Sequence, residues 1–226
     1  MQILEFILDN KEYLQDFITR STYNSNAIEG NTLTYAETYA ILYNDNSFKI
    51  SSKEPREIYE AINHKNALEL VFKHLSNKKE FNERFIKEIN KIINKNIKDI
   101  YGYRSVQVFI RGSEYIPSAP KKIPNLMNYY VYNYNNCKED IFLKIARYHI
   151  EFEKIHPFED GNGRTGRLIL NYELLKNNIA PIIIVKEDGI KYFEFLKTND
   201  VLGLAEFFRR LSDKERDRIE KFKNNV

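Results

Sequence analysis

Cysteine, tryptophan and long apolar runs are scarce or missing in this chain. Cys137 is the single cysteine among 226 residues, which excludes an intramolecular disulfide framework and a metal site built from several thiolates. One cysteine is typical of a protein from a reducing compartment. No apolar segment approaches the roughly 20 residues that a membrane-spanning helix needs. Glu5 and Asp9 lie where a secretory signal peptide would be basic and then apolar. We therefore expect a soluble, cytoplasmic protein that does not bind membranes.

Charge of one sign is also lacking. The formal net charge is only +3, and acidic and basic residues are interspersed along the chain. This balance gives no electrostatic basis for binding nucleic acid, which would require a basic face or stripe. Tyrosine and phenylalanine are plentiful, and 42% of the residues are hydrophobic, so the chain can bury a sizeable core. Length and composition predict one globular domain over residues 1–226.

Apolar residues recur every three or four positions through most of the chain, which is the spacing of amphipathic helices. Thr34 and Glu37 form a capping-box pattern, and Pro55 suits the first turn of a helix. The fold class predicted is all-α. The helices are expected over residues 3–18, from 34, and over 55–75, 81–93, 124–134, 141–155, 163–178 and 190–211, the last with a break near 199–203.

One short region has a different pattern. Val106, Val108 and Ile110 alternate with Gln107, Phe109 and Arg111, and Gly112 with Ser113 then separates them from Tyr115 and Ile116. Alternation bounded by Gly-Ser predicts a small β-hairpin. The charged residues from 212 onward predict a solvated helix end.

Residues 156–167, HPFEDGNGRTGR, concentrate more chemistry than any other segment. An imidazole, a carboxylate, an amide, three glycines and two arginines lie within twelve residues. Glycines let backbone N–H groups close on a ligand, and arginines hold anionic oxygens in a fixed geometry. The segment therefore predicts a polyphosphate site with a base beside it.

The spacing of Gly161, Gly163 and Gly166 also matches the dinucleotide fingerprint G-x-G-x-x-G, with Glu187 and Asp188 some twenty residues later. That fingerprint requires a preceding buried strand, whereas residues 141–155 have helical spacing. A phosphate-binding P-loop would need Lys and Ser or Thr after the last glycine, where Arg167 and Leu168 stand. Both alternatives are rejected, and the glycine loop is expected to join two helices.

Each polar residue of the loop can be given a chemical role. Asn162 can cap the following helix, whose free N–H groups and partial positive charge attract an anion. Arg164 and Arg167 are three residues apart and project from one helix face toward successive phosphates. Asp160 can supply a carboxylate to Mg²⁺, and His156 can accept a proton from an attacking hydroxyl.

These residues resemble the signature of the Fic family, His-Pro-Phe-x-[Asp/Glu]-Gly-Asn-[Gly/Lys]-Arg-x-x-Arg, at every defined position. The resemblance implies a mostly helical fold and transfer of AMP from ATP to a Tyr, Ser or Thr hydroxyl of a protein. It implies that His156 deprotonates that hydroxyl and that Asp160 holds Mg²⁺. Family members that phosphorylate typically have Lys in place of Gly163 and lack the final Arg, so this sequence favours AMP transfer.

The same resemblance assigns the phosphate ligands. Asn162, with the backbone of Gly161 and Gly163, would bind the α- and β-phosphates. Arg164 would hold the α/β region and Arg167 the γ-phosphate. Outside the motif, we expect two further residues to contact the adenine, namely Tyr192 and Asn199.

The segment from Tyr103 and Arg104 through Val108, Ile110, Gly112 and Ser113 resembles the family's flap. A flap aligns the target segment beside the site by strand-like pairing. The alternative interpretation is an edge hairpin of no special role.

Ser25, Glu29 and Gly30 match the inhibitory motif [Ser/Thr]-x-x-x-Glu-[Gly/Asn], placed N-terminal to the catalytic core as in one class of the family. Ser25 and Glu29 are four apart and share a helix face. Our hypothesis is that Glu29 pairs with Arg167, so that ATP cannot seat its γ-phosphate. The domain would then comprise N-terminal inhibitory helices (1–50), a catalytic core (51–211) and a charged tail (212–226).

The function predicted is that of an autoinhibited protein adenylyltransferase that uses ATP and Mg²⁺. Alternatives are an enzyme that removes AMP from a target or does both, with Glu29 positioning water, and a non-catalytic nucleotide-binding regulatory module. The target protein is not readable from the sequence. Self-modification and a homodimer are both compatible with it, and Glu29 could act within a chain or across a dimer.

Overall fold

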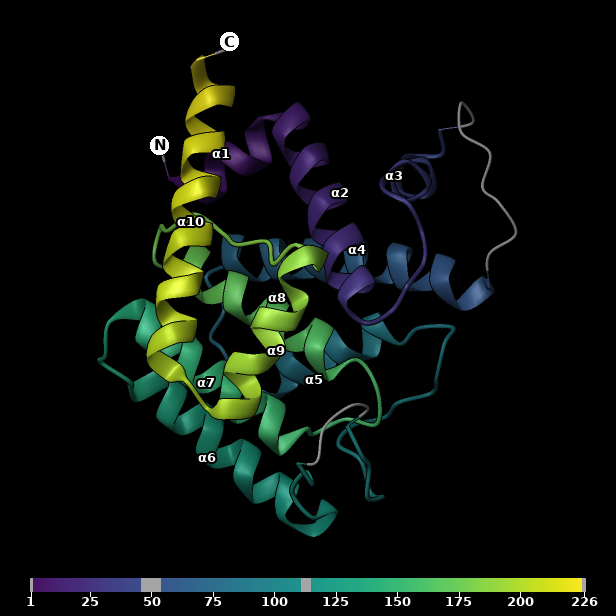
Figure 1. Ribbon diagram of the computed structural model, residues 1–226, viewed down its shortest axis with the longest axis vertical. Coiled ribbons are helices and arrows are strands. Elements are labelled where there is room, and N and C mark those ends of the chain that lie inside the picture. The colour runs from purple at the N-terminus through teal and green to yellow at the C-terminus, as the bar shows by residue number, and fades with distance from the viewer. Residues whose placement is uncertain (1, 46–53, 111–114, 225–226) are drawn as a thin grey trace.

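The computed structural model describes residues 2–45, 54–110 and 115–224. It contains ten α-helices over these residues and assigns no strand to them, so the all-α prediction is confirmed (Figure 1). The helices are α1 (Ile3–Asp9), α2 (Lys11–Ile28), α3 (Tyr35–Tyr43), α4 (Pro55–Ser76), α5 (Glu83–Ile93), α6 (Ile123–Asn136), α7 (Ile141–Ile155), α8 (Asn162–Lys176), α9 (Gly189–Thr198) and α10 (Val201–Asn224).

Helix starts follow local chemistry. Thr34 accepts a hydrogen bond from the backbone N–H of Glu37, whose carboxylate bonds back to Thr34, which completes the predicted capping box. Pro55 opens α4, as expected. Asp140 caps α7 by accepting hydrogen bonds from two backbone N–H groups of its first turn. The helix predicted over 3–18 is instead two, because the chain turns at Asn10, which caps α2.

Helix α8 is the centre of the molecule and lies in the middle of the ribbon diagram (Figure 1). Leu168, Tyr172 and Leu175 face a core cluster that includes residues of α1, α2 and α4–α7. Leu170 and Leu174 face a second cluster built from α7, α9 and α10. A helix that is apolar on opposite faces must be surrounded by other elements of the protein. Any polar residue at its N-terminal end is therefore also drawn into the interior.

The first half of α2 is fastened to α10 by side chains. Arg20 donates two hydrogen bonds to Glu215, at 2.7 and 2.8 Å, and the Tyr13 hydroxyl donates another at 2.6 Å. Arg218 pairs with Asp16. The N-terminal helices are thus fastened to the C-terminal helix by buried charges.

The expectation of a solvated helix end from residue 212 is wrong. Ser212, Glu215 and Ile219 are each at most 5% exposed, because one face of α10 packs on the rest of the molecule. The boundary predicted at 211/212 falls inside this continuous helix, and the one at 50/51 lies outside the described residues.

The predicted β-hairpin is not formed as a backbone ladder in the described part of the chain. Residues 106–110 and 115–118, here called the two arms, have no strand assignment, and Gly112 and Ser113 lie outside the described residues. The arms are connected by side chains instead: Gln107 Nε2 donates to the carbonyl of Pro117 at 3.1 Å. Pro117 has no N–H to return, which breaks the pairing that a ladder would need.

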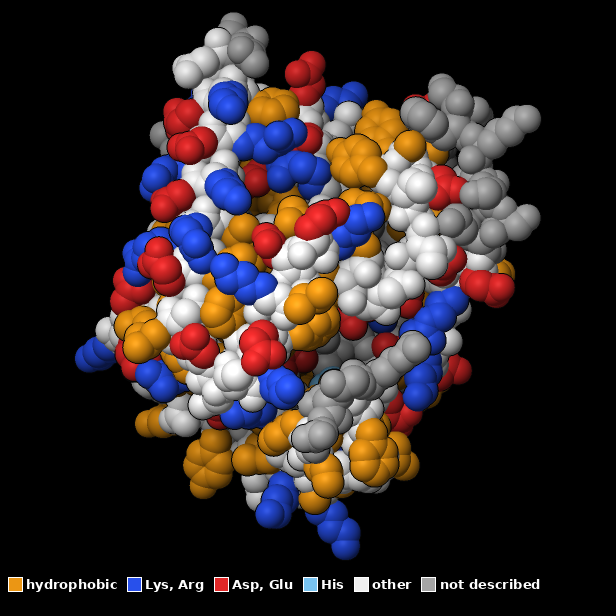
Figure 2. Space-filling model, in the orientation of Figure 1, with side chains coloured by type: hydrophobic (Ala, Val, Ile, Leu, Met, Phe, Trp, Pro, Cys, Tyr) orange, Lys and Arg blue, Asp and Glu red, His pale blue; other side chains and the backbone are white. Residues whose placement is uncertain are grey.

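The face shown in Figure 2 mixes acidic and basic side chains, and hydrophobic side chains gather at its lower end, where Figure 1 shows α6. The exposed aromatic residues include Tyr129 and Tyr132 on α6 and Phe109 in the first arm. None of the helices in the described part of the chain combines the length and apolar character that crossing a bilayer requires.

We predict that Glu215→Ala lowers the free energy of unfolding by about 3–5 kcal/mol, because it leaves the largely buried Arg20 without its main counter-charge. Glu206→Ala on the same helix, which removes a side chain that is itself 63% exposed, should cost at most about 0.5 kcal/mol. Urea unfolding followed by circular dichroism measures both. Equal midpoints for the two variants would contradict the importance of the α2–α10 anchor.

Candidate active site

The motif forms a loop between two helices, as the sequence predicts. Helix α7 ends at Ile155 and α8 begins at Asn162, so the dinucleotide alternative, which needs a preceding strand, is excluded. His156 adopts a left-handed backbone conformation, with φ at 49°, and caps α7 by donating its N–H to the carbonyl of Phe152. Such a conformation is uncommon for a residue other than glycine and is concentrated at functional sites.

Gly161 is the residue that turns the chain into α8. Its φ is 75°, and a Cβ atom there would lie 2.8 Å from the Ile93 side chain and 3.0 Å from Asn94. Both the backbone conformation and the space therefore require glycine. Asn90 and Asn94 of α5 fasten the loop from the other side, because each donates its amide to the carbonyl of Asp160, at 2.9 and 3.2 Å.

Asn162 is placed differently from expectation. Gly161, not Asn162, is the N-cap residue, and no side chain caps α8. The Asn162 amide accepts from the N–H of Phe158 and donates to its carbonyl, both at 2.9 Å, which closes the loop on itself. The first N–H groups of α8 consequently have no intrahelical or capping partner and remain available to an anion.

His156 lies at the mouth of the loop with its side chain partly exposed. Its Nδ1 is 3.3 Å from the carbonyl of Glu153, which favours a proton on Nδ1 and leaves Nε2 as the acceptor. Burial lowers the pKa of His156 below its usual 6.5; the bond to Glu153 opposes this shift and the nearby Arg104 adds to it. The imidazole is therefore neutral at pH 7 and able to take a proton.

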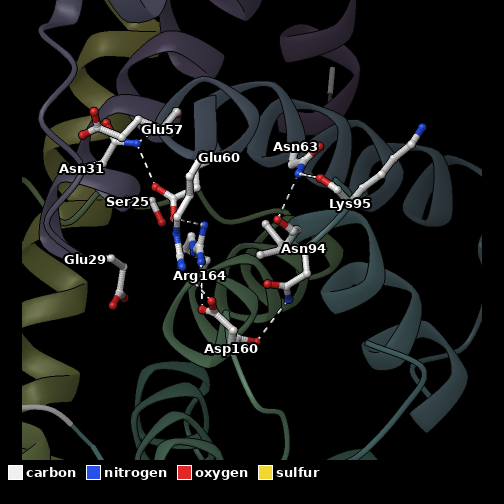
Figure 3. Close-up of polar contacts among 12 residues, drawn as sticks. Ser25, Glu29, Asn31, Glu57, Glu60, Asn63, Asn94, Lys95, Asp160 and Arg164 are labelled. Atoms are coloured by element: carbon white, nitrogen blue, oxygen red, sulfur yellow. Dashed lines mark hydrogen bonds and ion pairs between the residues drawn. The ribbon is translucent and has the colours of Figure 1, made fainter. Parts of the chain in front are cut away.

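Two guanidinium groups are buried at the start of α8. Arg164 and Arg167 are 2% and 6% exposed. Arg164 Nη2 lies 3.2 Å from Asp160, and its Nη1 lies 3.3 Å from Glu60 of α4 (Figure 3). Among the described residues, the Nε and Nη1 atoms of Arg164 and the Nη1 atom of Arg167 have no hydrogen-bond partner. Buried donors of this kind are costly unless a ligand accepts from them.

Arg167 is held by both residues of the expected inhibitory motif. Its Nε donates to the Ser25 hydroxyl at 3.0 Å, and its Nη2 donates to Glu29 Oε1 at 2.8 Å. A Cβ atom on Gly163 would collide with the Glu29 carboxylate, so Glu29 reaches Arg167 only because residue 163 is glycine. Glu29 follows directly on α2, as its C-cap residue, and its side chain is 35% exposed.

Behind Arg167 lies a buried group of titratable side chains. Burial raises the pKa of Glu153 to about 8, a shift that Arg167 opposes and Glu29 reinforces. The His149 Nε2 atom is 2.6 Å from the Tyr192 hydroxyl. Burial, aided by Arg167, lowers the pKa of His149 to about 3, so this histidine is neutral. Because Glu153 keeps its proton below about pH 8, it carries no charge that would repel the Glu29 carboxylate.

The two residues expected to contact adenine differ in how exposed their side chains are. Tyr192 is fully buried in the second core cluster and its hydroxyl is engaged with His149, so in this position it offers no surface to a base. Asn199 is exposed at the end of α9, where it accepts a hydrogen bond from Lys154 at 2.8 Å. The adenine contact of Asn199 stays a prediction.

Arg104 links the loop at His156 to the two arms, a role that the sequence did not reveal. It is 3% exposed, and its Nε donates to the carbonyl of His156 at 2.7 Å while its Nη1 donates to that of Val106 at 2.8 Å. Its Nη2 reaches the carbonyl of Ser118 in the second arm. Val108 and Ile110 of the first arm are partly exposed. One side chain thus joins both arms to the loop of residues 156–161.

The comparisons with known proteins agree with this geometry. Residues 80–174, from the start of α5 through most of α8, match the model of the Fic/DOC family. The chain contains a Fic domain. Its fold is shared with a Fic domain-containing signaling protein from Bacteroides thetaiotaomicron, at a TM-score of 0.84 and 26% identity, over 95% of this chain and 90% of that one. Fic-1 from C. elegans matches with a TM-score of 0.79 and 25% identity, over 100% of this chain and 67% of that one.

Curated relatives of this Fic domain carry the name protein adenylyltransferase Fic. The protein from Aedes aegypti is 31% identical over 198 residues, which cover 84% of this chain and 39% of the relative. The protein from Culex quinquefasciatus is 30% identical over the same shares. This chain therefore spans well under half of the length of the curated relatives that it matches.

We predict that Arg104→Ala loosens the arms from the loop. The loss of buried charge-assisted hydrogen bonds should lower the free energy of unfolding by about 3 kcal/mol and speed amide exchange over residues 105–110. Lys98→Ala, which removes a surface ion pair with Glu159 of the same loop, is the matched control and should change little. Hydrogen exchange as slow in Arg104→Ala as in Lys98→Ala would contradict the linking role.

Proposed function

We propose that this Fic domain transfers AMP from ATP to a hydroxyl side chain of a protein and that Glu29 restrains the reaction through Arg167. The observation that carries the proposal is the pair of buried guanidinium groups with unsatisfied donors beside a neutral histidine. A site for neutral ligands would not bury two permanent positive charges next to a helix N-terminus. The names of the curated relatives support the same reaction.

The chemistry assigned to each residue follows from its position. His156 Nε2 accepts the proton of the attacking hydroxyl, so that the oxygen can attack the α-phosphorus while pyrophosphate leaves. The N–H groups at the start of α8, at Gly163 and its neighbours, bind the phosphates. Arg164 stabilises charge at the α- and β-phosphates, and Arg167 holds the γ-phosphate and so fixes the direction of the leaving group.

The donor set at Asp160 suits Mg²⁺ brought in with ATP. The described residues contain no group of three or more His, Cys, Asp or Glu side chains able to hold a metal by themselves. Mg²⁺ commonly uses one or two carboxylates together with substrate phosphates, so a single accessible carboxylate fits. Asp160 would hold the ion, which would neutralise phosphate charge. Its Oδ2 now pairs with Arg56, whose side chain is 56% exposed and free to turn into solvent.

The inhibitory role of Glu29 rests on competition for one guanidinium group. With Glu29 bound, Arg167 donates two hydrogen bonds to Ser25 and one to Glu29. A γ-phosphate must displace that carboxylate and would also meet its negative charge. Only the Glu29 side chain has to move, since α2 is anchored elsewhere by Arg20.

The target is a protein segment docked along the arms, which expose Val106, Phe109 and Ile116. Because the arms are not paired in a ladder and Arg104 ties them to the carbonyl of His156, a target segment in extended conformation could pair with them beside that residue. The single cysteine supports a reducing, cytoplasmic setting. A homodimer and self-modification stay predictions.

Removal of AMP is the second candidate function. The Glu29 carboxylate is 35% exposed at the site, so it can also orient a water molecule against an AMP–protein bond. Protein labelled by the Glu29→Gly variant and then mixed with unlabelled wild type would lose its label if this activity exists. Stable label under these conditions would exclude it.

The central test uses ATP labelled at either the α- or the γ-phosphate. We expect label to enter protein only from the α-position, and Glu29→Gly to raise the rate at least about tenfold, which corresponds to one charge-assisted hydrogen bond. His156→Ala in that background should lower the rate by at least about a hundredfold, because the proton acceptor is gone. Transfer of the γ-label would instead identify a kinase, and equal labelling by wild type and Glu29→Gly would refute inhibition.

The pH dependence gives an independent check. His156 acts only when neutral, and its pKa in the folded protein lies below 6.5. The rate of AMP transfer by Glu29→Gly should therefore rise as the pH increases through that lowered pKa and exceed half of its maximum at pH 6.5. A rising limb with its midpoint above 6.5, measured as kcat/KM between pH 5 and 8, would contradict this assignment.

A further inference from the structure

Glu60 is a buried carboxylate that neither the sequence pattern nor the proposed mechanism uses. It lies on α4, is 7% exposed, and faces the start of α8 (Figure 3). Its Oε1 is 3.0 Å from Arg56 Nε and 3.3 Å from Arg164 Nη1. Its Oε2 accepts a hydrogen bond from the Asn31 amide at 2.9 Å. Arg56 is the neighbour of Glu60 one turn earlier on α4, whereas Asn31 and Arg164 are distant in sequence and are brought to it only by the fold.

Arg164 needs this carboxylate because its other acidic partner has a second task. A guanidinium group that is 2% exposed is strongly destabilising unless a counter-charge stays with it. Asp160 supplies one, at 3.2 Å from Nη2, but in the proposed reaction the same carboxylate turns to Mg²⁺. Glu60, which is not within the loop, remains at Nη1 throughout.

The orientation of Glu60 is itself fixed. Asn31 Nδ2 donates both to Glu60 and to the backbone carbonyl of Glu57, one turn earlier on α4. The Asn31 N–H donates to the carbonyl of Asn26 at the end of α2. The carboxylate is therefore held from the side of α2, and its Oε1 is directed at Arg164. Asn31 stands two residues after Glu29. The turn that follows α2 therefore carries the proposed inhibitory residue and, through Asn31, also holds Glu60, the counter-charge of Arg164.

We propose that Glu60 is a positioning residue, which stays at Nη1 of Arg164 and thereby holds the guanidinium in the orientation that presents its unpartnered Nε donor to the α-phosphate. This inference rests on the proposed AMP transfer. A phosphate gripped by a mobile guanidinium would still bind, since the charge remains, but it would not be aligned for in-line attack. Loss of Glu60 should therefore lower the rate of transfer much more than the affinity for nucleotide.

The test compares Glu29→Gly with the double variant Glu29→Gly/Glu60→Gln. Glutamine keeps the size of the side chain and the acceptor for Asn31 but removes the charge at Arg164. We expect kcat for α-label transfer to fall at least about tenfold. The Kd of a non-hydrolysable ATP analogue, measured by calorimetry, should stay within about threefold of the parent or become tighter. A purely structural role would weaken both quantities together, and either that result or an unchanged kcat would overturn the proposal.

Glu57→Gln in the same background is the matched control. Glu57 lies one turn before Glu60 on α4, and its carboxylate accepts a hydrogen bond from the N–H of Thr32 in the same turn after α2, but not from Arg164. It should leave kcat and Kd at the parental values. A loss of kcat equal to that of Glu60→Gln would assign the effect to the turn and refute positioning through Arg164.

A second variant keeps the test decisive if Glu60→Gln does not fold. Glu60→Asp retains the buried negative charge but draws the carboxylate back by one methylene. In the Glu29→Gly background we expect it to fold and to lose kcat at least about tenfold with little change in Kd, while kinetics equal to those of the Glu29→Gly parent would overturn the proposal. If the Glu29→Gly parent transfers no α-label at all, the proposed function fails and this inference with it. An active parent with an unaffected Glu60 variant refutes the inference alone.

Discussion

The burial of two guanidinium groups at the start of α8 constrains everything around them. Arg164 and Arg167 are drawn inward because α8 is packed on opposite faces, yet neither charge can be left in the interior without compensation. Their counter-charges come from three directions: Asp160 within the loop, Glu60 from α4 and Glu29 from the end of α2. Within the described part of the chain, three guanidinium nitrogen atoms are left without a hydrogen-bond partner after these contacts, which makes the arrangement suited to a polyphosphate.

This distribution of charge places the residue of the proposed inhibition, Glu29, and the proposed phosphate ligand Arg167 in direct contact. Helix α2 is fastened by Glu215 at Arg20, and its far end lies against Arg167. The helix that carries Glu29 is therefore part of the core, and the proposed switch is a rotation of one carboxylate that is 35% exposed. Gly163 leaves the room for that carboxylate, and Asn31 fixes the turn that follows it.

The motif could be interpreted from the sequence because its residues are contiguous. Twelve neighbouring positions carry the proposed base, the loop glycines and both arginines, and the helical spacing before them excluded a dinucleotide fold. The Ser25 and Glu29 spacing predicted one helix face, and both residues contact Arg167. Two expectations depended on longer-range packing and were wrong: α10 buries one face beyond residue 212, and the arms are joined by Arg104 and Gln107 rather than by a ladder.

Helical periodicity, caps and the loop chemistry are local properties, so the sequence by itself determined the all-α class, the helix–loop–helix motif and the residues of the candidate site. Only the tertiary structure decided which distant side chains support that site. Glu60, Arg104 and Asn90 look like ordinary polar residues in the sequence, because nothing in their neighbourhood along the chain distinguishes them. They acquire their roles when packing buries Arg164, the carbonyl of His156 and the carbonyl of Asp160, since each of these buried groups then needs a partner that its own segment does not provide.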